Sequence, residues 1–193
     1  MTSILGLDIS TSCTGWSILQ TEGSDIKGVQ IGSIDLKKKT ELMDKSIAAR
    51  DHLHTVVKQY LPEYIFVEEN AQAFRPGASS AQTLMKLAKF NGIVSYVAYC
   101  LSGVAPVNIN VTHARKILGI KVQREKLCGV STKDQVHSWV CAHPHLTNYP
   151  WPTRTMTRGP RKGQEVKLDS VYDMSDAFVI ALAGHQKLVQ NQY

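Results

Sequence analysis

With 193 residues, of which 43% are hydrophobic, the chain is long enough to bury one sizeable core and short for two, so we expect one domain over residues 1–193. Its apolar start is too short for a signal peptide and is interrupted by Asp8, and no apolar run has the length of a membrane span. The net charge of +6 favours a polyanionic partner, although charge alone fits a solvated surface equally well. We therefore expect an intracellular, cytoplasmic protein that does not bind a membrane.

The cysteines are spread along the chain without a C-x-x-C pair, which is typical of reduced thiols in a cytosolic protein. They are Cys13, Cys100, Cys128 and Cys141. Cys141 is followed closely by His143 and His145, but the group lacks a second ligand pair at a spacing known from zinc sites. We expect ordinary surface and core roles for these side chains.

The first half of the chain predicts a sheet with one helix inserted. Apolar runs joined by short turn-rich stretches predict three strands in an antiparallel meander, at residues 3–7, 15–19 and 29–36. Helical spacing of apolar residues follows over 41–60, until Pro62 stops the helix. The apolar run 64–67 then predicts a buried strand, and a strand that follows a helical crossover is expected to lie parallel to the first.

The second half predicts helices around this sheet. Residues 80–101 have an apolar surface broader than one stripe, so we hypothesise that this helix serves both the core and a subunit interface. A strand over 106–111 leads to a short helix capped by Thr112, and Ser131 opens a capping box for another helix. Proline, glycine and basic residues predict a mobile loop or hairpin over 143–167, and a last helix over 173–188 packs on the sheet.

Four acids stand where the predicted elements begin or end: Asp8, Glu68, Asp173 and Asp176. Each alone is most often a turn or cap residue. Because Asp8 and Glu68 close neighbouring strands and the two aspartates share one helix face, we expect the four carboxylates to converge. Such a cluster repels itself unless hard cations hold it together, so the acids predict a site for two Mg²⁺ ions, or Mn²⁺, that hydrolyses phosphodiesters.

Four stretches, in the same order as in the family, resemble RuvC-type Holliday junction resolvases. ILGLDISTSCTGWSIL is similar to the family's opening strand with its metal-binding aspartate, and PEYIFVEEN to the strand with its catalytic glutamate, which favours Glu68 over Glu69. STKDQV resembles the segment that places a lysine near the scissile phosphate, here Lys133, and DMSDAFVIALAGH the last metal-binding helix. The resemblance covers nearly the whole chain and implies an RNase H-like α/β fold, a mixed sheet of antiparallel and parallel strands flanked by helices.

The resemblance also implies how DNA is bound. The family pairs two subunits through the helix after the glutamate strand, here 80–101, and two symmetric sites suit paired nicks in a four-way junction. Phe74 is the expected junction wedge, although it lies later than in the family, and the segment 143–167 is longer than expected. The expected DNA contacts are Phe74, Arg75, Arg115, Lys116, Arg154, Arg158, Arg161 and Lys162, of which Arg115 and Lys116 fit a solvated helix equally well.

The function predicted from the sequence is thus a Mg²⁺-dependent crossover junction endonuclease, from a bacterium or a bacteriophage. A flap, debranching or RNA–DNA hybrid nuclease of the same fold is the main alternative. A kinase-like ATP-binding domain shares the opening G-x-D pattern, but the chain lacks a second glycine-rich phosphate motif. A non-catalytic DNA-binding scaffold needs no converging acids.

Overall fold

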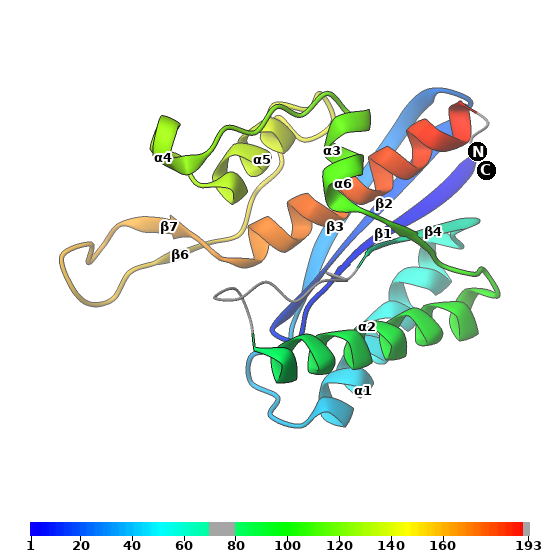
Figure 1. Ribbon diagram of the computed structural model, residues 1–193, viewed down its shortest axis with the longest axis horizontal. Helices are drawn as coiled ribbons and strands as arrows, with labels where there is room; N and C mark the ends of the chain where they lie inside the picture. Colours follow the sequence, from blue (N-terminus) through cyan, green and yellow to red (C-terminus); the bar gives the residue numbers. More distant parts are fainter. Residues whose placement is uncertain (70–79, 191–193) are drawn as a thin grey trace.

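The computed structural model describes residues 1–69 and 80–190. Its main sheet has five strands in the order β3-β2-β1-β4-β5 (Figure 1). The antiparallel meander consists of β1 (Thr2–Ile9), β2 (Cys13–Glu22) and β3 (Asp25–Asp35), and the strands β4 (Tyr64–Glu68) and β5 (Val107–Ile109) extend it in parallel. The predicted mixed sheet is confirmed.

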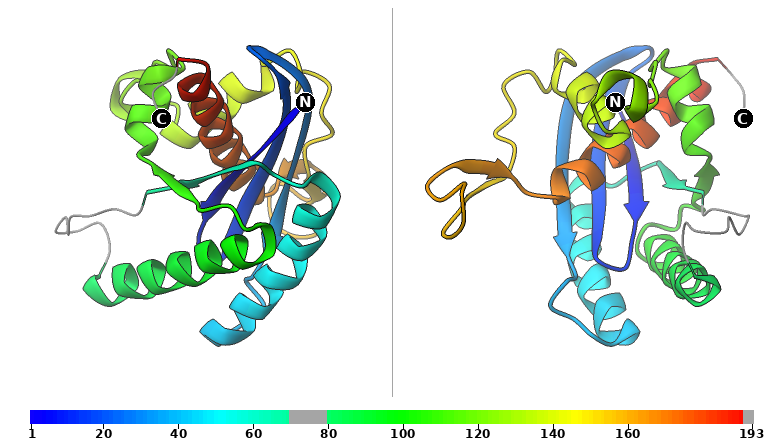
Figure 2. Two further views of the ribbon diagram at one scale, coloured as in Figure 1. Left: turned by 90° about the vertical axis from the view of Figure 1, so that its right-hand side faces the viewer. Right: turned by 60° about the vertical axis from the view of Figure 1, so that its left-hand side comes forward.

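Helices cover both faces of this sheet (Figures 1 and 2). On one face α1 (Leu42–Tyr60) and α2 (Ala81–Ser102) pack over Leu5, Leu7 and Ile65. On the other face α6 (Ser170–Val189) packs over Ile4 and Phe66. Because side chains alternate along a strand, Asp8 belongs to the face of Ile4, the face that α6 covers. No helix in the described part of the chain is long and apolar enough to cross a membrane.

Two glycines allow α6 to lie directly on the sheet. A Cβ atom at Gly6 would collide with the backbone oxygen of Ala177, and one at Gly15 would collide with that of Asp173. The close approach brings the first turns of α6 next to the end of β1 and the start of β2. α6 begins at Ser170, three residues before the predicted start, so Asp173 lies inside the helix.

Smaller elements complete the fold: α3 (Val111–Ile117), α4 (Glu125–Cys128), α5 (Thr132–Cys141), β6 (Thr153–Thr155) and β7 (Glu165–Lys167). α4 was not predicted. The side chain of Asn110 caps α3 by accepting from the backbone N–H groups of Thr112 and His113, so the prediction of Thr112 as the cap was wrong. Asn110 directly follows β5, and its side-chain oxygen reaches the N–H groups two and three residues further along the chain, as an N-cap residue does.

The segment 143–167 is not uniformly a loop. Leu146 is buried in the core, and Tyr149 and Trp151 pack against the core, which corrects the expectation of a mobile loop or hairpin throughout 143–167. The sequence does not reveal these core residues, because their irregular spacing shows neither a helical nor a strand period in a segment that turns this often. The remainder, 153–167, is a hairpin in which β6 pairs with β7, as one of the two predicted alternatives had it.

Candidate active site

Two of the four acids come from neighbouring strand ends. Leu7 of β1 pairs with Val67 of β4, so the next residues, Asp8 and Glu68, stand side by side on the face covered by α6. The two groups interact electrostatically, since burial raises the pKa of Asp8 and the charge of Glu68 raises it further. The strand register therefore produces the first half of the predicted acid cluster.

The other two acids come from α6. Asp173 and Asp176 lie three residues apart, on the side of the helix that faces the strand ends. All four acids line one cavity of about 530 Å³. The described residues that line it are Asp8, Ser10, Ser12, Cys13, Lys37, Glu68, Lys133, Asp169, Asp173 and Asp176. The four acids thus converge, as expected, on one cavity, here called the acid cavity.

Burial dominates the electrostatics of this cavity. Loss of solvent raises the pKa of Asp8 well above its ordinary value, and the charges of Glu68, Asp176 and Asp173 raise it further. Burial likewise raises the pKa of Glu68, of Asp173 and of Asp176. Acids that resist ionisation at one place are typical of a site that binds a cation, because a bound cation removes the repulsion between them.

The donor set fits a hard divalent cation. Four carboxylates offer only oxygen ligands, which suit Mg²⁺ or Mn²⁺. Across 1–69 and 80–190, no three His, Cys, Asp or Glu side chains already form a metal-ligand group. Asp176 is instead engaged with Arg115, which donates to its carboxylate. Metal binding at Asp176 would thus compete with this ion pair.

Arg115 reaches the acid cavity from α3. Its Nη2 atom donates to Oδ1 of Asp176 at 3.3 Å, and both side chains are about four-fifths buried, with exposed fractions of 21% and 17%. The guanidinium lowers the pKa of Asp176, although burial outweighs it and the net shift is upward. Neither sequence-based alternative for Arg115, a phosphate contact or a solvated helix, included this ion pair. No local signal predicts a contact between residues 61 positions apart.

Lys133 reaches the cavity from the first turn of α5. Ser131 caps this helix by accepting from the N–H group of Asp134, so the predicted cap at Ser131 is confirmed. Asp134 also accepts hydrogen bonds from the hydroxyl groups of Ser131, at 2.7 Å, and Tyr172, at 2.8 Å. The Lys133 ammonium lies 5.8 Å from the centroid of the Tyr172 ring. Tyr172, on α6 beside Asp173, thus connects the lysine to the helix that carries the acids.

The other predicted DNA contacts lie outside the acid cavity. Arg154, Arg158, Arg161 and Lys162 are exposed on the β6–β7 hairpin. Lys116, with Arg115 and Lys121, lines a separate cavity of about 470 Å³. Phe74 and Arg75 lie outside the described residues.

Sequence reasoning missed several residues of the cavity lining. Ser10, Ser12 and Cys13 belong to the turn that follows Asp8, and this proximity in sequence was the one available signal. Burial and the Asp173 carboxylate raise the pKa of Cys13, which therefore stays a thiol. Lys37 and Asp169 form an exposed ion pair of 3.2 Å at the edge of the cavity. Their positions depend on tertiary packing.

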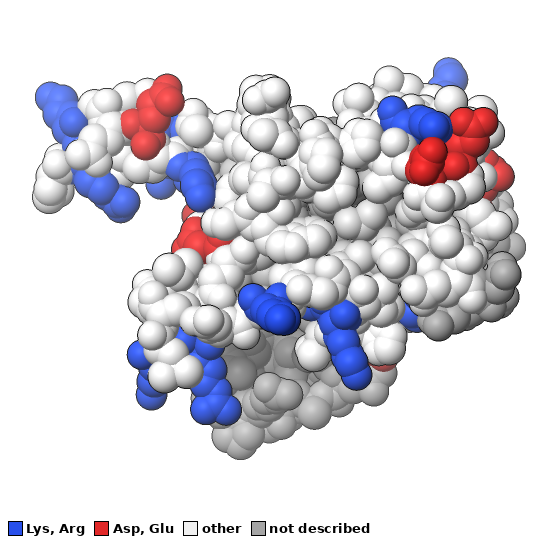
Figure 3. All heavy atoms as spheres, turned by 90° about the horizontal axis from the view of Figure 1, so that it is seen from above, with Lys and Arg blue, Asp and Glu red and all other residues white. Residues whose placement is uncertain are grey.

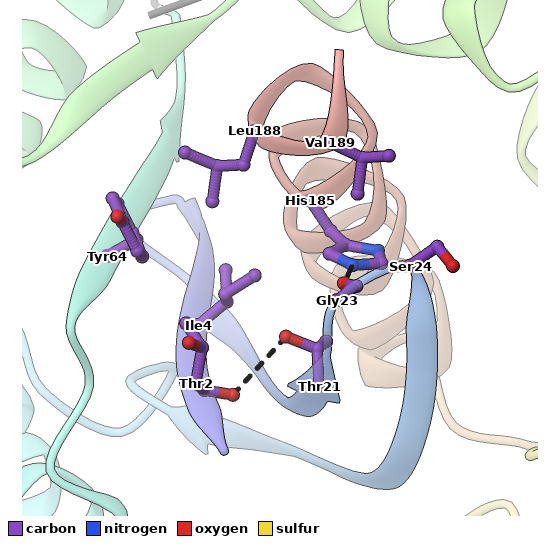
Figure 4. Close-up of a pocket in the computed structure, with 9 residues that line it drawn as sticks. All are labelled: Thr2, Ile4, Thr21, Gly23, Ser24, Tyr64, His185, Leu188 and Val189. Carbon is purple, nitrogen blue, oxygen red and sulfur yellow. Dashed lines mark hydrogen bonds between the residues drawn. The ribbon is translucent and has the colours of Figure 1, made fainter. Parts of the chain in front are cut away.

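A further cavity, of about 340 Å³, lies at the opposite end of the sheet, where β1 starts and α6 ends (Figure 4). None of the described residues that line it carries a carboxylate. The Nε2 atom of His185 is hydrogen-bonded to the backbone oxygen of Gly23 at 3.0 Å. This lining offers nothing for phosphodiester chemistry.

Comparison with known proteins gives a consistent result. The family model described as crossover junction endodeoxyribonuclease RuvC matches residues 4–152. RuvC of Sphingopyxis alaskensis is 36% identical over 91 residues, which are 47% of this chain and 55% of that protein. RuvC of Erythrobacter litoralis is 32% identical over 127 residues, 61% of this chain and 66% of that protein. The chain thus spans between about half and two thirds of the length of these curated relatives.

Solved structures share the fold at low sequence identity. Thermus thermophilus RuvC in complex with a Holliday junction substrate gives a TM-score of 0.64 at 16% identity, covering 97% of this chain and 95% of that one. The Fowlpox virus resolvase, in complex with substrate Holliday junction DNA, gives 0.51 at 16% identity, covering 97% and 99%. At this level of identity the likeness concerns the fold.

Proposed function

The chain belongs to the RuvC family of crossover junction endodeoxyribonucleases, and on this basis we propose that it resolves four-way DNA junctions by paired symmetric nicks. The observation that carries the proposal is the gathering of Asp8, Glu68, Asp173 and Asp176 in one cavity of a protein with net charge +6. Acids without a cation would repel a DNA phosphate, whereas acids that hold divalent cations attract one.

The four acids are proposed to hold Mg²⁺, with two ions in each active site and Mn²⁺ as a substitute. Such ions, when bound, supply Lewis acidity and lower the pKa of bound water. Because burial raises the pKa of each acid, protons compete with the cation for the carboxyl groups, and these must be ionised to act as ligands. Arg115 assists ionisation at Asp176, because its charge lowers the pKa of that group.

Lys133 is proposed to act on the substrate. Its ammonium group lines the acid cavity beside the carboxylates, where it can approach a phosphate oxygen. A cation there offsets the negative charge that grows on the phosphate in the transition state. The face of Tyr172 limits where the lysine chain can lie, since a cation is attracted to an aromatic face.

A homodimer through α2 is proposed to pair the two nicks. Met85, Tyr96 and Tyr99 of this helix are exposed, a large apolar and aromatic surface for one helix. Aromatic and methionine side chains are enriched in subunit interfaces. Twofold symmetry would place two acid cavities on the symmetric strands of a junction. Acting on DNA, the protein would work in the cytoplasm of a bacterium or of an infected host cell.

Substrate selectivity is tested by a panel of cleavage assays in Mg²⁺. A mobile four-way junction, a flap, a replication fork and an RNA–DNA hybrid, all of matched length, are compared by single-turnover rate. We expect the junction to be cleaved fastest. Equal rates on all four would contradict junction resolution, and fastest cleavage of the flap or the hybrid would favour the alternative nuclease functions.

A further inference from the structure

Residues 153–167, called the basic arm, form a two-stranded ribbon separate from the main sheet and projecting from the body of the molecule (Figures 1 and 2). The RuvC family match ends at residue 152, directly before it. The tip is ordered by backbone bonds, since Met156 donates to Gln164 at 2.9 Å and Gly163 donates to Met156 at 2.8 Å. The arm is thus a folded element that lies, like α6, beyond the region that the family model matches.

The arm is strongly cationic. It carries five basic residues, Arg154, Arg158, Arg161, Lys162 and Lys167, against the single acid Glu165. All five are exposed, and none forms an ion pair with any residue that the structure describes. Seen from above, blue side chains cover the tip of the arm, and a notch separates the arm from the body (Figure 3). Unpaired cations on a projecting ribbon favour a polyanionic partner.

The base of the arm adjoins the acid cavity. The N–H group of Leu168 donates to the oxygen of Pro152 at 3.0 Å and closes the hairpin, after which the chain enters α6. Pro152, Arg154 and Leu168 line a small cavity of about 230 Å³. That cavity shares Cys13, Lys37 and Asp169 with the acid cavity. A strand that is cut at the acids therefore passes the base of the arm.

The composition of the arm indicates which part of DNA it binds. It contains no aromatic residue, so it offers no surface on which unpaired bases could stack. Arginine and lysine instead contact phosphates, independently of sequence. From Thr153 to Arg158, six residues at about 3.3 Å each extend about 20 Å, which is about six base-pair steps of 3.4 Å.

We propose that the basic arm is a clamp for duplex DNA, which grips the phosphates of one junction arm about six base pairs from the cut. The proposal rests on the junction substrate proposed above. Arg158 and Arg161, at the tip, contact the distant phosphates, while Arg154 faces the phosphates next to the active site. The clamp adds affinity for the duplex that leaves the cut and takes no part in the chemical step.

The test measures the affinity for a four-way junction against salt concentration, without divalent metal so that no strand is cut. The variant is R158Q/R161Q, and the control K27Q/K58Q removes the same charge from exposed or half-exposed sites at the opposite end of the sheet. Each phosphate contact contributes about 0.9 to the slope of log Kd against log salt. We expect the arm variant to lower this slope by about two per subunit. The control should keep the wild-type slope and the wild-type single-turnover rate.

A second measurement locates the clamp. The phosphates about five to seven steps from the cut are replaced by neutral methylphosphonates in a second junction. Wild type should bind this junction more weakly than the normal one, with about the affinity of R158Q/R161Q. The arm variant should bind the two junctions equally well. Wild-type junction cleavage combined with an unchanged slope in R158Q/R161Q would overturn the clamp alone. Failure of wild type to bind or cut any junction would instead overturn the proposed function.

Discussion

The guanidinium of Arg115 lies 3.3 Å from the carboxylate of Asp176, one of the acids that line the acid cavity. It is the one basic side chain ion-paired to an acid of the cluster within 1–69 and 80–190. The pair occurs where a divalent cation is proposed to bind, and it keeps Asp176 closer to its ionised state than burial alone would allow.

Replacing Arg115 by Gln should therefore weaken metal binding in a pH-dependent way. Without the guanidinium the pKa of Asp176 rises further. Protons then compete with the metal for this carboxylate up to a higher pH than in wild type. We expect a lower affinity for Mn²⁺ at neutral pH that recovers as the pH is raised, measured by titration calorimetry on the protein without DNA. Lys116→Gln, which removes an exposed charge from the same helix, is the control. Equal Mn²⁺ affinities in the two variants across the pH range would disprove the role of Arg115.

Asp8→Asn should stabilise the metal-free protein while abolishing cleavage. The folded state raises the pKa of Asp8, so it binds a proton more tightly than the unfolded chain does. The free energy of unfolding therefore falls as the pH rises from the ordinary Asp value through the raised one, by about 1.4 kcal/mol for each unit between them. We expect the Tm of Asp8→Asn to exceed that of wild type at neutral pH and the difference to shrink in acid.

Thermal unfolding in the presence of a chelator, followed against pH, measures this difference. Asp25→Asn, at the exposed start of β3, should show no such gain at neutral pH. An Asp8→Asn variant that is less stable than wild type at every pH would contradict the view that burial and charge repulsion at Asp8 lower the stability of the metal-free protein.

Tyr172 should position Lys133. Tyr172→Phe removes the hydrogen bond to Asp134 but keeps the ring beside the lysine, whereas Tyr172→Leu removes both. We expect the single-turnover rate on a junction to fall severalfold in the first variant and further in the second, toward the loss of about 10²-fold expected for Lys133→Met. Junction affinity should stay constant in all three. A Tyr172→Leu variant with the wild-type rate would show that the ring does not position the lysine.

Tyr96→Glu should separate the two subunits. The side chain is 67% exposed on α2, and a buried charge in its place would oppose a dimer through this helix. We expect sedimentation to show a monomer and junction cleavage to yield single nicks instead of paired ones. Lys58→Gln, on α1, lowers the net charge by the same one unit and is the control for charge. A dimeric Tyr96→Glu variant would place the subunit interface elsewhere.

The acids could be predicted from the sequence because local patterns determine them. Asp8 and Glu68 each end an apolar run, and a parallel pair of strands brings such ends together. Asp173 and Asp176 follow from helical spacing. Lys133 came from the resemblance, since its own context resembles any solvated lysine.

The remaining features depend on tertiary packing. The pairing of Arg115 with Asp176 depends on how α3 lies against α6, and nothing near either residue encodes it. Tyr172 appears ordinary in sequence, yet its hydroxyl reaches Asp134 on another helix. Trp151 lies in a stretch rich in proline and packs on the core only because the chain folds back. Non-local contacts of this kind have no period to detect.

Junction resolution by the acid cavity is tested most directly by cleavage of a synthetic mobile four-way junction beside a matched linear duplex, in Mg²⁺ or Mn²⁺, with wild type and Asp176→Asn. We predict symmetric nicks on the junction by wild type, no cleavage of the duplex, and no cleavage of either by Asp176→Asn. Cleavage of the duplex as fast as the junction, or full activity in Asp176→Asn, would contradict the assignment.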